Sequence, residues 1–440
     1  MTHETSLHLY QRYDRIVPGG VHSNARMRDP HPLYFRAGSG ARVWDVDGNE
    51  YLDCIIGYAS CILGHADPDV TAAVTAVIEA GLSNGLETEL SLRVAEQLHE
   101  MIPGAEQVRF AGTGTEAVMK SLMIARAVTG KGRIAKAEGG YNGWYDDVLV
   151  SVRPPVTRAG PRRAPRPVTE AAGLRDGLQT VVIPFNDARR AVDIILKQQK
   201  DLAAVMIEPV LFECGCIEPV PGYLETLREV TARHNILLIF DEIATGFRLA
   251  PGGAQERYGV MPDLAVFEKG MANGYPISAV VGSARYMQAT HPRSGSVAYL
   301  GANNANQVPL AAAAACLAKL KPGGIQEQLQ AAVETLRSHF NASVAETGVA
   351  ARFNGIGGLF QVYFTPQPVT DYRSAQRSSR DAYHIFHQRM FEAGILMGWD
   401  YLSSHHGVSA AHSAPDIEAI GRAIRQAMRA VAGHAAPGTP

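Results

Sequence analysis

Three separated positions in this chain hold residue types that could do chemistry together. The first is the turn Ala111-Gly-Thr-Gly-Thr115, which is small and rich in hydroxyl groups and opens a segment of helical periodicity. Free amides and the helix dipole at such a terminus favour a phosphate group, and Thr113 and Thr115 add hydroxyl donors. The alternative interpretation is a threonine N-cap that only starts the helix.

The second position is Asp241, which follows the apolar run Ile236–Phe240. A run without polar residues is typical of a strand buried on both faces, and ligands of α/β sheets bind at the carboxyl ends of such strands. A helix cap or a metal ligand is the alternative, although no His or Cys cluster lies nearby in the sequence to share a metal. A carboxylate here could keep a heteroaromatic nitrogen protonated, as an electron-sink cofactor requires.

The third position is Lys269, which follows the run Leu264–Phe267 after one intervening residue, Glu268, and precedes a glycine-rich turn. A lysine with little polar company at a strand end suits imine formation. A lone lysine is more commonly a surface charge. The combination of Lys269 with Asp241 and the hydroxyl-rich turn favours the chemical role.

Composition excludes several classes of protein. Hydrophobic residues make up 46% of the 440 residues, charged residues 19%, and the formal net charge is −2, which gives no nucleic-acid footprint. No apolar run reaches the ~18 residues that span a bilayer, and the N-terminus does not resemble a secretion signal. Five sparse cysteines predict buried thiols, with no disulfide framework and no metal site. We expect a cytoplasmic protein without nucleic-acid or membrane partners.

The elements that must position these residues alternate along the chain. Short β-rich runs separated by segments of helical period predict a mostly parallel sheet covered by helices. The runs are Val108–Phe110, Ile134–Lys136, Thr180–Ile183, Ala203–Ile207, Ile236–Phe240, Leu264–Phe267 and Ile277–Val281. We therefore expect an α/β fold with an N-terminal arm over 1–60, a large domain over 61–310 and a small α+β domain over 311–440. Asp47-Gly48 predicts a hairpin within the arm.

These motifs, taken in order, resemble the class III aminotransferases over nearly the whole chain. The resemblance rests on Gly112-Thr-Gly-Thr-Glu-Ala117, Tyr141-Asn-Gly-Trp144, Ile207-Glu-Pro209, Phe240-Asp-Glu-Ile-Ala-Thr-Gly-Phe-Arg248 and Lys269. It implies a fold-type I enzyme with a mostly parallel seven-stranded sheet and a smaller α+β domain. It also implies pyridoxal 5'-phosphate as the cofactor and a homodimer with active sites at the subunit interface.

The resemblance also implies a role for each matching residue. Lys269 would carry the cofactor as an imine and shuttle protons, and Asp241 would hold the pyridine nitrogen. An aromatic ring stacked on the cofactor fixes its plane. The other cofactor-binding residues would be Thr113, Gly114 and Thr115 at the phosphate, Tyr141 and Ile243 on the two ring faces, Glu208 beside them, and Asn304 at the partner subunit's phosphate.

Within the family, the chain is similar to glutamate-1-semialdehyde 2,1-aminomutase and related amine transferases. Pro18-Gly-Gly-Val-His-Ser-Asn-Ala-Arg26 matches a motif of that group, which implies that Ser23 and Arg26 grip a substrate carboxylate. A surface charge is the alternative for Arg26. Tyr58 stands where the group has a tryptophan, so it is a candidate pocket wall.

Several departures bear on the reaction. Glu268 precedes the lysine where small residues are usual, and Asn142 replaces a histidine. An Arg- and Pro-rich segment over 152–167 replaces the group's gating loop, and it is expected to be either a structureless loop or a lid over an acidic substrate. The changed gate favours intermolecular transfer from an amino acid to an aldehyde or ketone, in amino-sugar or specialised-metabolite biosynthesis. The alternatives are an intramolecular aminomutase, an epimerase and a catalytically silent binding homologue.

Overall fold

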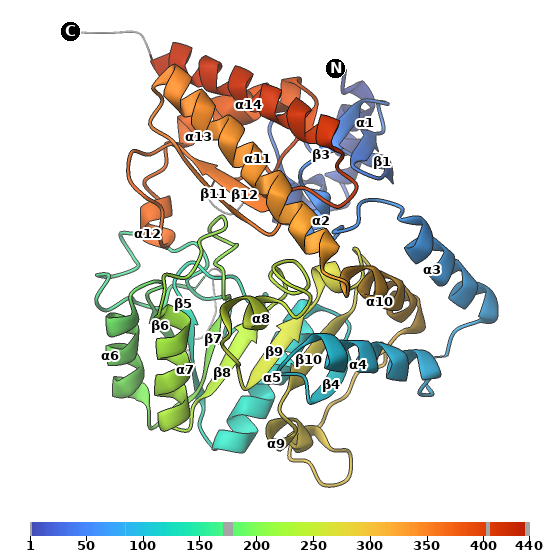
Figure 1. Cartoon of the computed structure of the whole chain (residues 1–440), viewed down its shortest axis with the longest axis vertical. Coiled ribbons are helices and arrows are strands. Elements are labelled where there is room, and N and C mark those ends of the chain that lie inside the picture. Colours follow the sequence, from blue (N-terminus) through green and yellow to red (C-terminus); the bar gives the residue numbers. More distant parts are fainter. Residues whose placement is uncertain (1, 84, 170–178, 402–404, 436–440) are drawn as a thin grey trace.

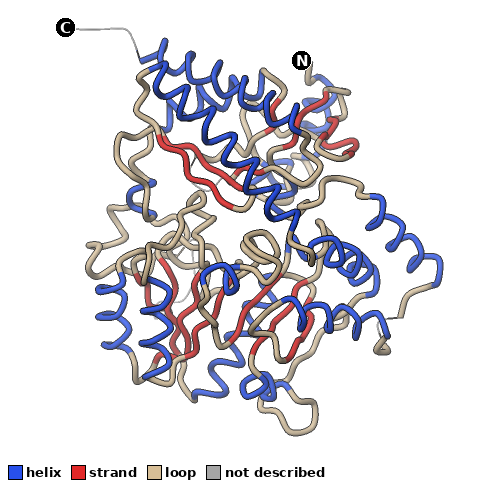
Figure 2. The backbone as a smooth tube through the Cα atoms, in the orientation of Figure 1, coloured by secondary structure: helices blue, strands red, loops and turns tan. Residues whose placement is uncertain are grey.

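The computed structural model describes residues 2–83, 85–169, 179–401 and 405–435, and a seven-stranded sheet is its largest among them. The strand order is β4-β10-β9-β8-β7-β5-β6, and β10 alone in this sheet runs antiparallel to its neighbours (Figures 1 and 2). The strands are β4 (Gln107–Ala111), β5 (Arg133–Ala137), β6 (Thr180–Ile183), β7 (Leu202–Ile207), β8 (Leu237–Asp241), β9 (Leu264–Phe267) and β10 (Ser278–Gly282). The predicted seven strands and the mostly parallel sheet are confirmed.

Helices cover both faces of this sheet, as the side chains of β8 show. Leu237 and Ile239 belong to a core cluster that includes residues of α5 (Gly114–Thr129). Leu238 and Phe240 belong to another cluster, which includes residues of α7 (Tyr223–Arg233). Because successive side chains of a strand point to opposite faces, the two helices lie on opposite sides of the sheet. Every residue of β8 is buried, which explains its wholly apolar run before Asp241.

The remaining helices of the large domain surround the sheet. They are α3 (Pro68–Ala80), α4 (Glu89–Met101), α6 (Ala188–Gln198), α8 (Ala254–Tyr258), α9 (Ala284–Met287) and α10 (Gln307–Leu320), with short 3-10 turns η3 (Lys269–Met271) and η4 (Gln288–Thr290). The start of α5 is fixed by Thr113, whose hydroxyl accepts a hydrogen bond from the amide of Glu116 at 3.3 Å. Its end is fixed by Gly130 in the left-handed conformation.

The N-terminal segment joins the C-terminal one through a shared sheet. Its elements are α1 (Glu4–Tyr13), η1 (Pro18–Gly20), η2 (Asn24–Arg26), β1 (Phe35–Ser39), β2 (Arg42–Asp45), β3 (Glu50–Asp53) and α2 (Ile56–Ala59). The hairpin predicted at Asp47-Gly48 joins the antiparallel strands β2 and β3. Strand β13 (Ile395–Leu396) then pairs with β3 in parallel. Figure 1 accordingly shows α1 and the C-terminal elements on the same side of the large sheet.

The C-terminal segment forms a small α+β unit above the carboxyl ends of the large sheet (Figure 1). Its elements are α11 (Gly324–Thr347), β11 (Arg352–Ile356), β12 (Leu359–Tyr363), α12 (Tyr372–Ala375), α13 (Arg380–Glu392), β14 (His406–Gly407) and α14 (Ala414–Ala435). Strands β11, β12 and β14 form an antiparallel sheet, and α11 and α13 pack against α14. Among the described helices, none alone is long and apolar enough to cross a membrane, and one pair bent by 74°, α10 with α11, meets the criteria of length and composition together.

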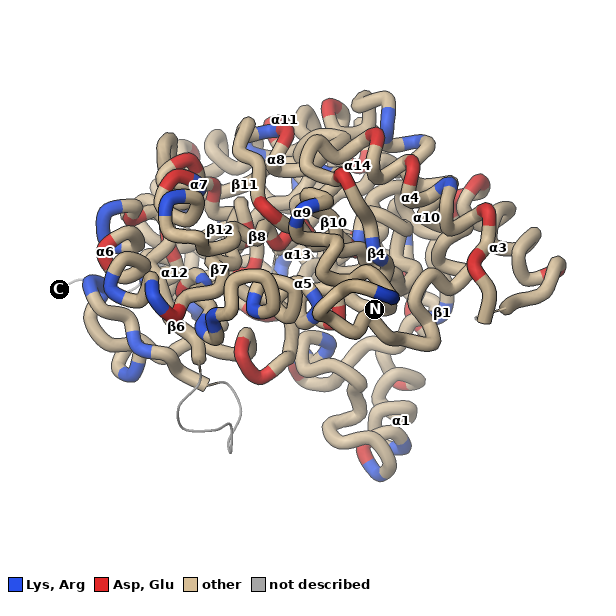
Figure 3. Tube along the Cα trace, turned by 90° about the horizontal axis from the view of Figure 1, so that it is seen from below, with Lys and Arg blue, Asp and Glu red and all other residues tan. Residues whose placement is uncertain are grey.

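Charged side chains of both signs are spread over the surface. Figure 3 shows lysines and arginines interleaved with aspartates and glutamates along most elements. This distribution agrees with the net charge of −2. A positive stripe of the kind that follows a nucleic-acid backbone would need basic residues gathered on one face.

Candidate active site

A cavity of ≈ 150 Å³ lies where β8 and β9 end and α5 begins. Its lining combines eight of the predicted site residues with six others. The predicted ones are Thr113, Gly114, Thr115, Tyr141, Glu208, Asp241, Ile243 and Lys269, and the others are Gly143, Phe212, Glu213, Ala244, Glu268 and His405. The fold therefore brings together predicted positions as far apart in the sequence as Thr113 and Lys269.

Asp241 is the most deeply placed acid of this cavity. The side-chain amide of Asn142 donates to its Oδ2 at 2.7 Å, and the backbone amide of Ile243 donates to its Oδ1 at 3.1 Å. Burial raises the pKa of Asp241 to about 6, although these two hydrogen bonds oppose the rise. The carboxylate is thus oriented by two donors and is ionised at neutral pH.

Lys269 begins the turn η3, one intervening residue after the end of β9, with a backbone φ of 39°. A positive φ is costly for a residue with a Cβ, and such conformations cluster at functional sites. The preceding residue, Glu268, is partly buried and does not point to solvent: its Oε1 accepts the amide hydrogen of Gly114 at 2.9 Å. Burial raises the pKa of Glu268, with the Gly114 amide and Lys269 acting in the opposite direction.

The turn at the start of α5 is closely packed. A Cβ on Gly114 would lie 2.6 Å from Glu268 Oε2 and 2.6 Å from a methyl carbon of Ile243. A Cβ on Gly143, whose φ is +101°, would lie 2.7 Å from the Thr115 hydroxyl oxygen. Both glycines are required by close approach of the backbone. The hydroxyl of Thr113 caps the helix, so the alternative interpretation of this residue as an N-cap is correct. The same residue also lines the cavity.

Glu208 fixes the backbone around the exposed ring of Tyr141. Its Oε1 accepts the Tyr141 amide hydrogen at 2.8 Å, and its Oε2 accepts the amide hydrogen of Phe212 at 3.2 Å. Burial, followed by the charges of Asp241 and Glu213, raises the pKa of Glu208 to about 8. Tyr141 itself is 42% exposed and is among the residues that line the cavity.

Comparison with known proteins places this geometry in a family. The family profile described as aminotransferase class-III matches residues 23–399. The chain belongs to the class III aminotransferases. Glutamate-1-semialdehyde 2,1-aminomutase of Methanothermobacter thermautotrophicus is 37% identical over 420 residues, covering 96% of this chain and 98% of that one. An omega-transaminase from Sphaerobacter thermophilus is 33% identical, covers 97% of both chains and has a TM-score of 0.90. A transaminase with PLP bound is 32% identical, covers 99% of both chains and also has a TM-score of 0.90.

The enzymes of this family use pyridoxal phosphate, and the residues present here fit that cofactor. Asp241 is a buried carboxylate that accepts only two hydrogen bonds from the described residues, which leaves lone pairs for a ring N–H. The start of α5 offers a helix dipole for a phosphate, and Lys269 supplies the amine. The carboxylate, the helix start and the amine thus match the ring nitrogen, the phosphate and the imine-forming carbon of the cofactor. The predicted cofactor and the class III family are confirmed.

The predicted substrate residues are divided between two places. Arg26 and Tyr58 line a second cavity of ≈ 200 Å³ between the N-terminal segment and residues 396–399, whose walls are mainly apolar. The Tyr58 hydroxyl donates to the carbonyl of Ala25 at 2.6 Å, so it ties α2 to the turn that carries Arg26. Ser23 is exposed and does not line this cavity. Their role in substrate binding stays a prediction for this aminotransferase.

Asn304 lies outside the Lys269 cavity of its own chain. It lines another cavity with Ser83, residues 85–88 and Ser91, and its Oδ1 accepts a hydrogen bond from Lys120 Nζ at 3.0 Å. Its predicted place at the partner's phosphate concerns a second subunit and stays a prediction.

Ion pairs hold the Arg- and Pro-rich segment over 152–167 against the rest of the chain. Arg153 forms ion pairs with Glu213 at 3.0 Å and with Asp400 at 2.9 Å. Arg162 pairs with Asp371 at 2.6 Å. The segment is therefore tied to the small unit and is not a structureless loop. Arg153 also neutralises Glu213, which lines the Lys269 cavity.

Four residues of the site were missed by sequence reasoning, namely Asn142, Phe212, Glu213 and His405. Asn142 was noted only as a replaced histidine, whereas it donates to Asp241 across 99 residues of sequence. Burial, followed by the charge of Lys269, lowers the pKa of His405 to about 3, so its ring faces the cavity uncharged. Isolated residues of these types gave no signal in the sequence, because the fold alone brings them to the site.

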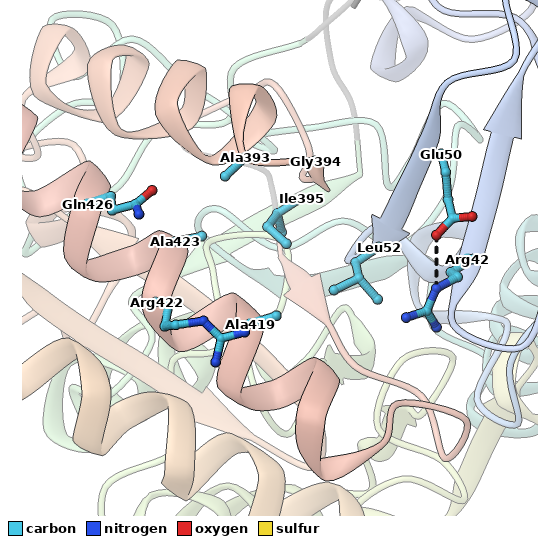
Figure 4. Close-up of a pocket in the computed structure, with 10 residues that line it drawn as sticks. All are labelled: Arg42, Glu50, Leu52, Ala393, Gly394, Ile395, Ala419, Arg422, Ala423 and Gln426. Atoms are coloured by element: carbon cyan, nitrogen blue, oxygen red, sulfur yellow. Dashed lines mark hydrogen bonds and ion pairs between the residues drawn. The ribbon is translucent and has the colours of Figure 1, made fainter.

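A separate cavity lies away from the predicted cofactor and substrate residues. Its volume is ≈ 520 Å³, and it lies between β2–β3 and α14 (Figure 4). The side chains around it include Arg422 and the ion pair of Arg42 with Glu50 at 3.1 Å, and none of the predicted cofactor or substrate residues is among them. Within the described residues, no cluster of three or more His, Cys, Asp or Glu could hold a metal ion.

Proposed function

We propose that this class III aminotransferase moves an amino group from an amino acid donor to an aldehyde or ketone acceptor, in the biosynthesis of an amino sugar or specialised metabolite. The observation that carries the choice of acceptor is the charge around Lys269. Four acids line the cavity, namely Glu208, Glu213, Asp241 and Glu268, with Lys269 as the one lysine. Arg153 pairs with Glu213 and burial raises the pKa of Glu208 to about 8, so the unpaired negative charge lies mainly on Asp241 and Glu268. Like charges close together in a partly desolvated site repel strongly, so a carbonyl compound without a second acid is the better acceptor.

The cofactor, when bound, supplies an electron sink that stabilises negative charge on the reacting carbon. The chain's own residues supply the rest. Lys269 Nζ would move the proton between the two carbon atoms that exchange it, as a positioned general base and acid. Asp241 would keep the proton on the ring nitrogen, with Asn142 and the Ile243 amide fixing the carboxylate.

Other residues of the chain would hold the phosphate and the ring of the cofactor. We place the phosphate at the amides and hydroxyls of Thr113, Gly114 and Thr115, and the ring between Tyr141 and Ile243. Stacking would hold the ring plane so that the breaking bond stays aligned with the π-system. Glu208 supports the arrangement by fixing the amide of Tyr141.

A homodimer with shared active sites is part of this proposal. Large apolar side chains are exposed on segments beside the proposed contact, with Leu86 78% exposed and Leu300 80% exposed. Leu86 lines the same cavity as Asn304, so an exposed apolar side chain adjoins the residue that we propose to reach the partner. The segment with Leu300 also carries Asn304, which we propose to reach the partner's phosphate.

An intramolecular aminomutase is the second candidate, because the relative named above as an aminomutase matches the chain over nearly its full length. Arg26 in a cavity with Tyr58 would suit the carboxylate of such a substrate. An epimerase and a catalytically silent homologue have no specific observation in their favour.

The test follows the visible spectrum of the loaded enzyme while L-glutamate, L-glutamine or L-alanine is added singly, with assay of the released keto acid. One equivalent of keto acid per active site, with no further turnover until an aldehyde or ketone is supplied, is expected for the transferase. Continuous conversion of glutamate 1-semialdehyde without a keto acid would instead establish the mutase. Lys269→Ala is the control, since it must abolish either reaction; full activity in that variant would end both candidates.

A further inference from the structure

Glu268 places a carboxylate against the turn proposed to bind the cofactor's phosphate. Its Oε1 accepts the amide hydrogen of Gly114 at 2.9 Å, and its Oε2 is the atom that a Cβ on Gly114 would meet at 2.6 Å. The Gly114 amide is one of the first N–H groups of α5, which have no partner inside the helix. One anion therefore already uses a donor that the phosphate requires.

We propose that Glu268 sets the affinity for pyridoxal phosphate, because loading the cofactor requires this carboxylate to take up a proton and remain beside the phosphate as a neutral donor. The inference rests on the proposed position of the phosphate at Thr113–Thr115. It assigns a role to the acid that precedes Lys269, where a small residue would leave the amide free.

The surroundings favour protonation over retention of the charge. A phosphate carries about −1.5 to −2 charge at neutral pH, and a carboxylate within a few ångströms in a partly buried site opposes it. Burial already raises the pKa of Glu268 in the unloaded chain. The other titratable groups that line the same cavity are Tyr141, Glu208, Glu213, Asp241, Lys269 and His405. Since the pKa of His405 is lowered to about 3, Lys269 is the cation among them at neutral pH.

A protonated Glu268 balances the hydrogen bonds of the site. A neutral carboxyl group has one O–H donor, which can be given to a phosphate oxygen, whereas the ionised group only accepts. The Gly114 amide is then free to donate to the phosphate. One proton enters from solvent for each cofactor bound, and no other bond to Glu268 forms or breaks.

The sign of the pH dependence follows from this linkage. Where the unloaded Glu268 is ionised and the loaded one is protonated, affinity falls as pH rises, by about tenfold per pH unit. At low pH the acid is already protonated in the unloaded chain, and the dependence disappears. Other groups that titrate on loading contribute equally to a variant that differs only at position 268, so the ratio of the two affinities isolates Glu268.

The experiment compares wild-type protein with Glu268→Gln, each freed of cofactor and titrated with pyridoxal phosphate by absorbance between about pH 6 and about pH 9. Calorimetry in buffers of different ionisation enthalpy counts the protons taken up. Glu268→Gln is expected to bind at least about tenfold more tightly at the alkaline end, with the advantage shrinking toward acid pH and one proton fewer taken up.

Glu116→Gln is the matched control. Its carboxylate also lies at the start of α5 and accepts a backbone amide hydrogen, that of Gly112 at 2.8 Å, but it does not line the cavity. This variant should bind the cofactor as the wild type does. Equal affinities for wild type and Glu268→Gln, or a ratio that does not change with pH, would overturn the inference alone. Failure of the wild type to bind the cofactor would refute the proposed site as well.

Discussion

The hydrogen bond from Asn142 to Asp241 gives the most direct test of how the site controls a proton. Asn142→Ala removes a 2.7 Å bond to a buried carboxylate and leaves the Ile243 amide as the described donor to it. Hydrogen bonds to charged groups contribute about 1.5–3 kcal/mol. Their loss favours the protonated form of Asp241 by a factor of roughly 10–100, since about 1.4 kcal/mol is tenfold.

This change has a defined sign and magnitude in the pH profile. The pKa of Asp241 is already raised to about 6 by burial. Losing a donor to the ionised form raises it further, so the acid-side limb of the rate profile moves to higher pH. At neutral pH this rise of about one to two pKa units lowers the ionised fraction of Asp241 by about 2–10-fold, so we expect the amino-donor half-reaction to slow by about the same factor.

The assay is stopped-flow absorbance of the loaded enzyme with saturating donor across the pH range. Asn273→Ala is the matched control, because Asn273 is also a buried asparagine but bonds to the backbone of Leu63 and Gly64. It should lower stability without moving the acid-side limb. Asn142→His, which restores a ring N–H donor, should recover part of the rate. An unchanged limb in Asn142→Ala would refute the assigned role.

Three further predictions concern other parts of the chain. Gly143→Ala should weaken cofactor binding measured by absorbance titration, because its Cβ would lie 2.7 Å from the Thr115 hydroxyl oxygen at a φ of +101°. Arg373→Ala should lower the free energy of unfolding in urea by about 3–5 kcal/mol, since it leaves the buried carboxylate of Glu138 without the cation that binds it at 2.7 Å. In the unloaded protein, the pKa of about 8 at Glu208 makes the folded state hold a proton that the unfolded chain releases near 4.5. Its contribution therefore lowers stability as pH rises from about 4.5 to about 8, by ~1.4 kcal/mol per pH unit.

Each of these predictions has its own control. Gly132→Ala meets no atom within 4 Å and should leave cofactor affinity unchanged. Arg389→Ala breaks an exposed pair with Glu392 and should change stability by at most about 1 kcal/mol. For the pH dependence, buried histidines such as His412, with a pKa lowered to about 4, act in the opposite direction only below about 6.5. The decline should therefore be clearest above that pH, and a flat profile there would contradict it.

The strands and the reactive pair were predictable because their signals are local. An uninterrupted apolar run marks a doubly buried strand, and β8 shows this over every residue. Asp241 and Lys269 then stand at the ends of β8 and β9, which are parallel neighbours. Since parallel strands end at the same edge of a sheet, recognising the two strands was enough to predict that Asp241 and Lys269 share one site.

The contacts that tune the site were not predictable in the same way. Asn142 meets Asp241 across 99 residues, and Glu268 meets Gly114 across 154. Neither contact lies within one element, and side-chain direction in a turn is set by packing rather than by periodicity. The sequence drew attention to Glu268 as an unusual residue but gave no partner for it; the structure shows that its carboxylate accepts the hydrogen of the Gly114 amide.

The charges of the cavity link these separate observations. The buried acids Glu208 and Asp241 both have raised pKa values, and Glu268 is shifted in the same direction. Each shift records the cost of keeping negative charge in a cavity whose one lysine is Lys269. Adding a phosphate dianion to this set increases that cost, whereas a protonated ring nitrogen beside Asp241 reduces it. Cofactor affinity in this enzyme should therefore depend on which carboxylate takes up a proton, and Glu268, which lies against the helix start, is better placed for that than Asp241, which must stay ionised.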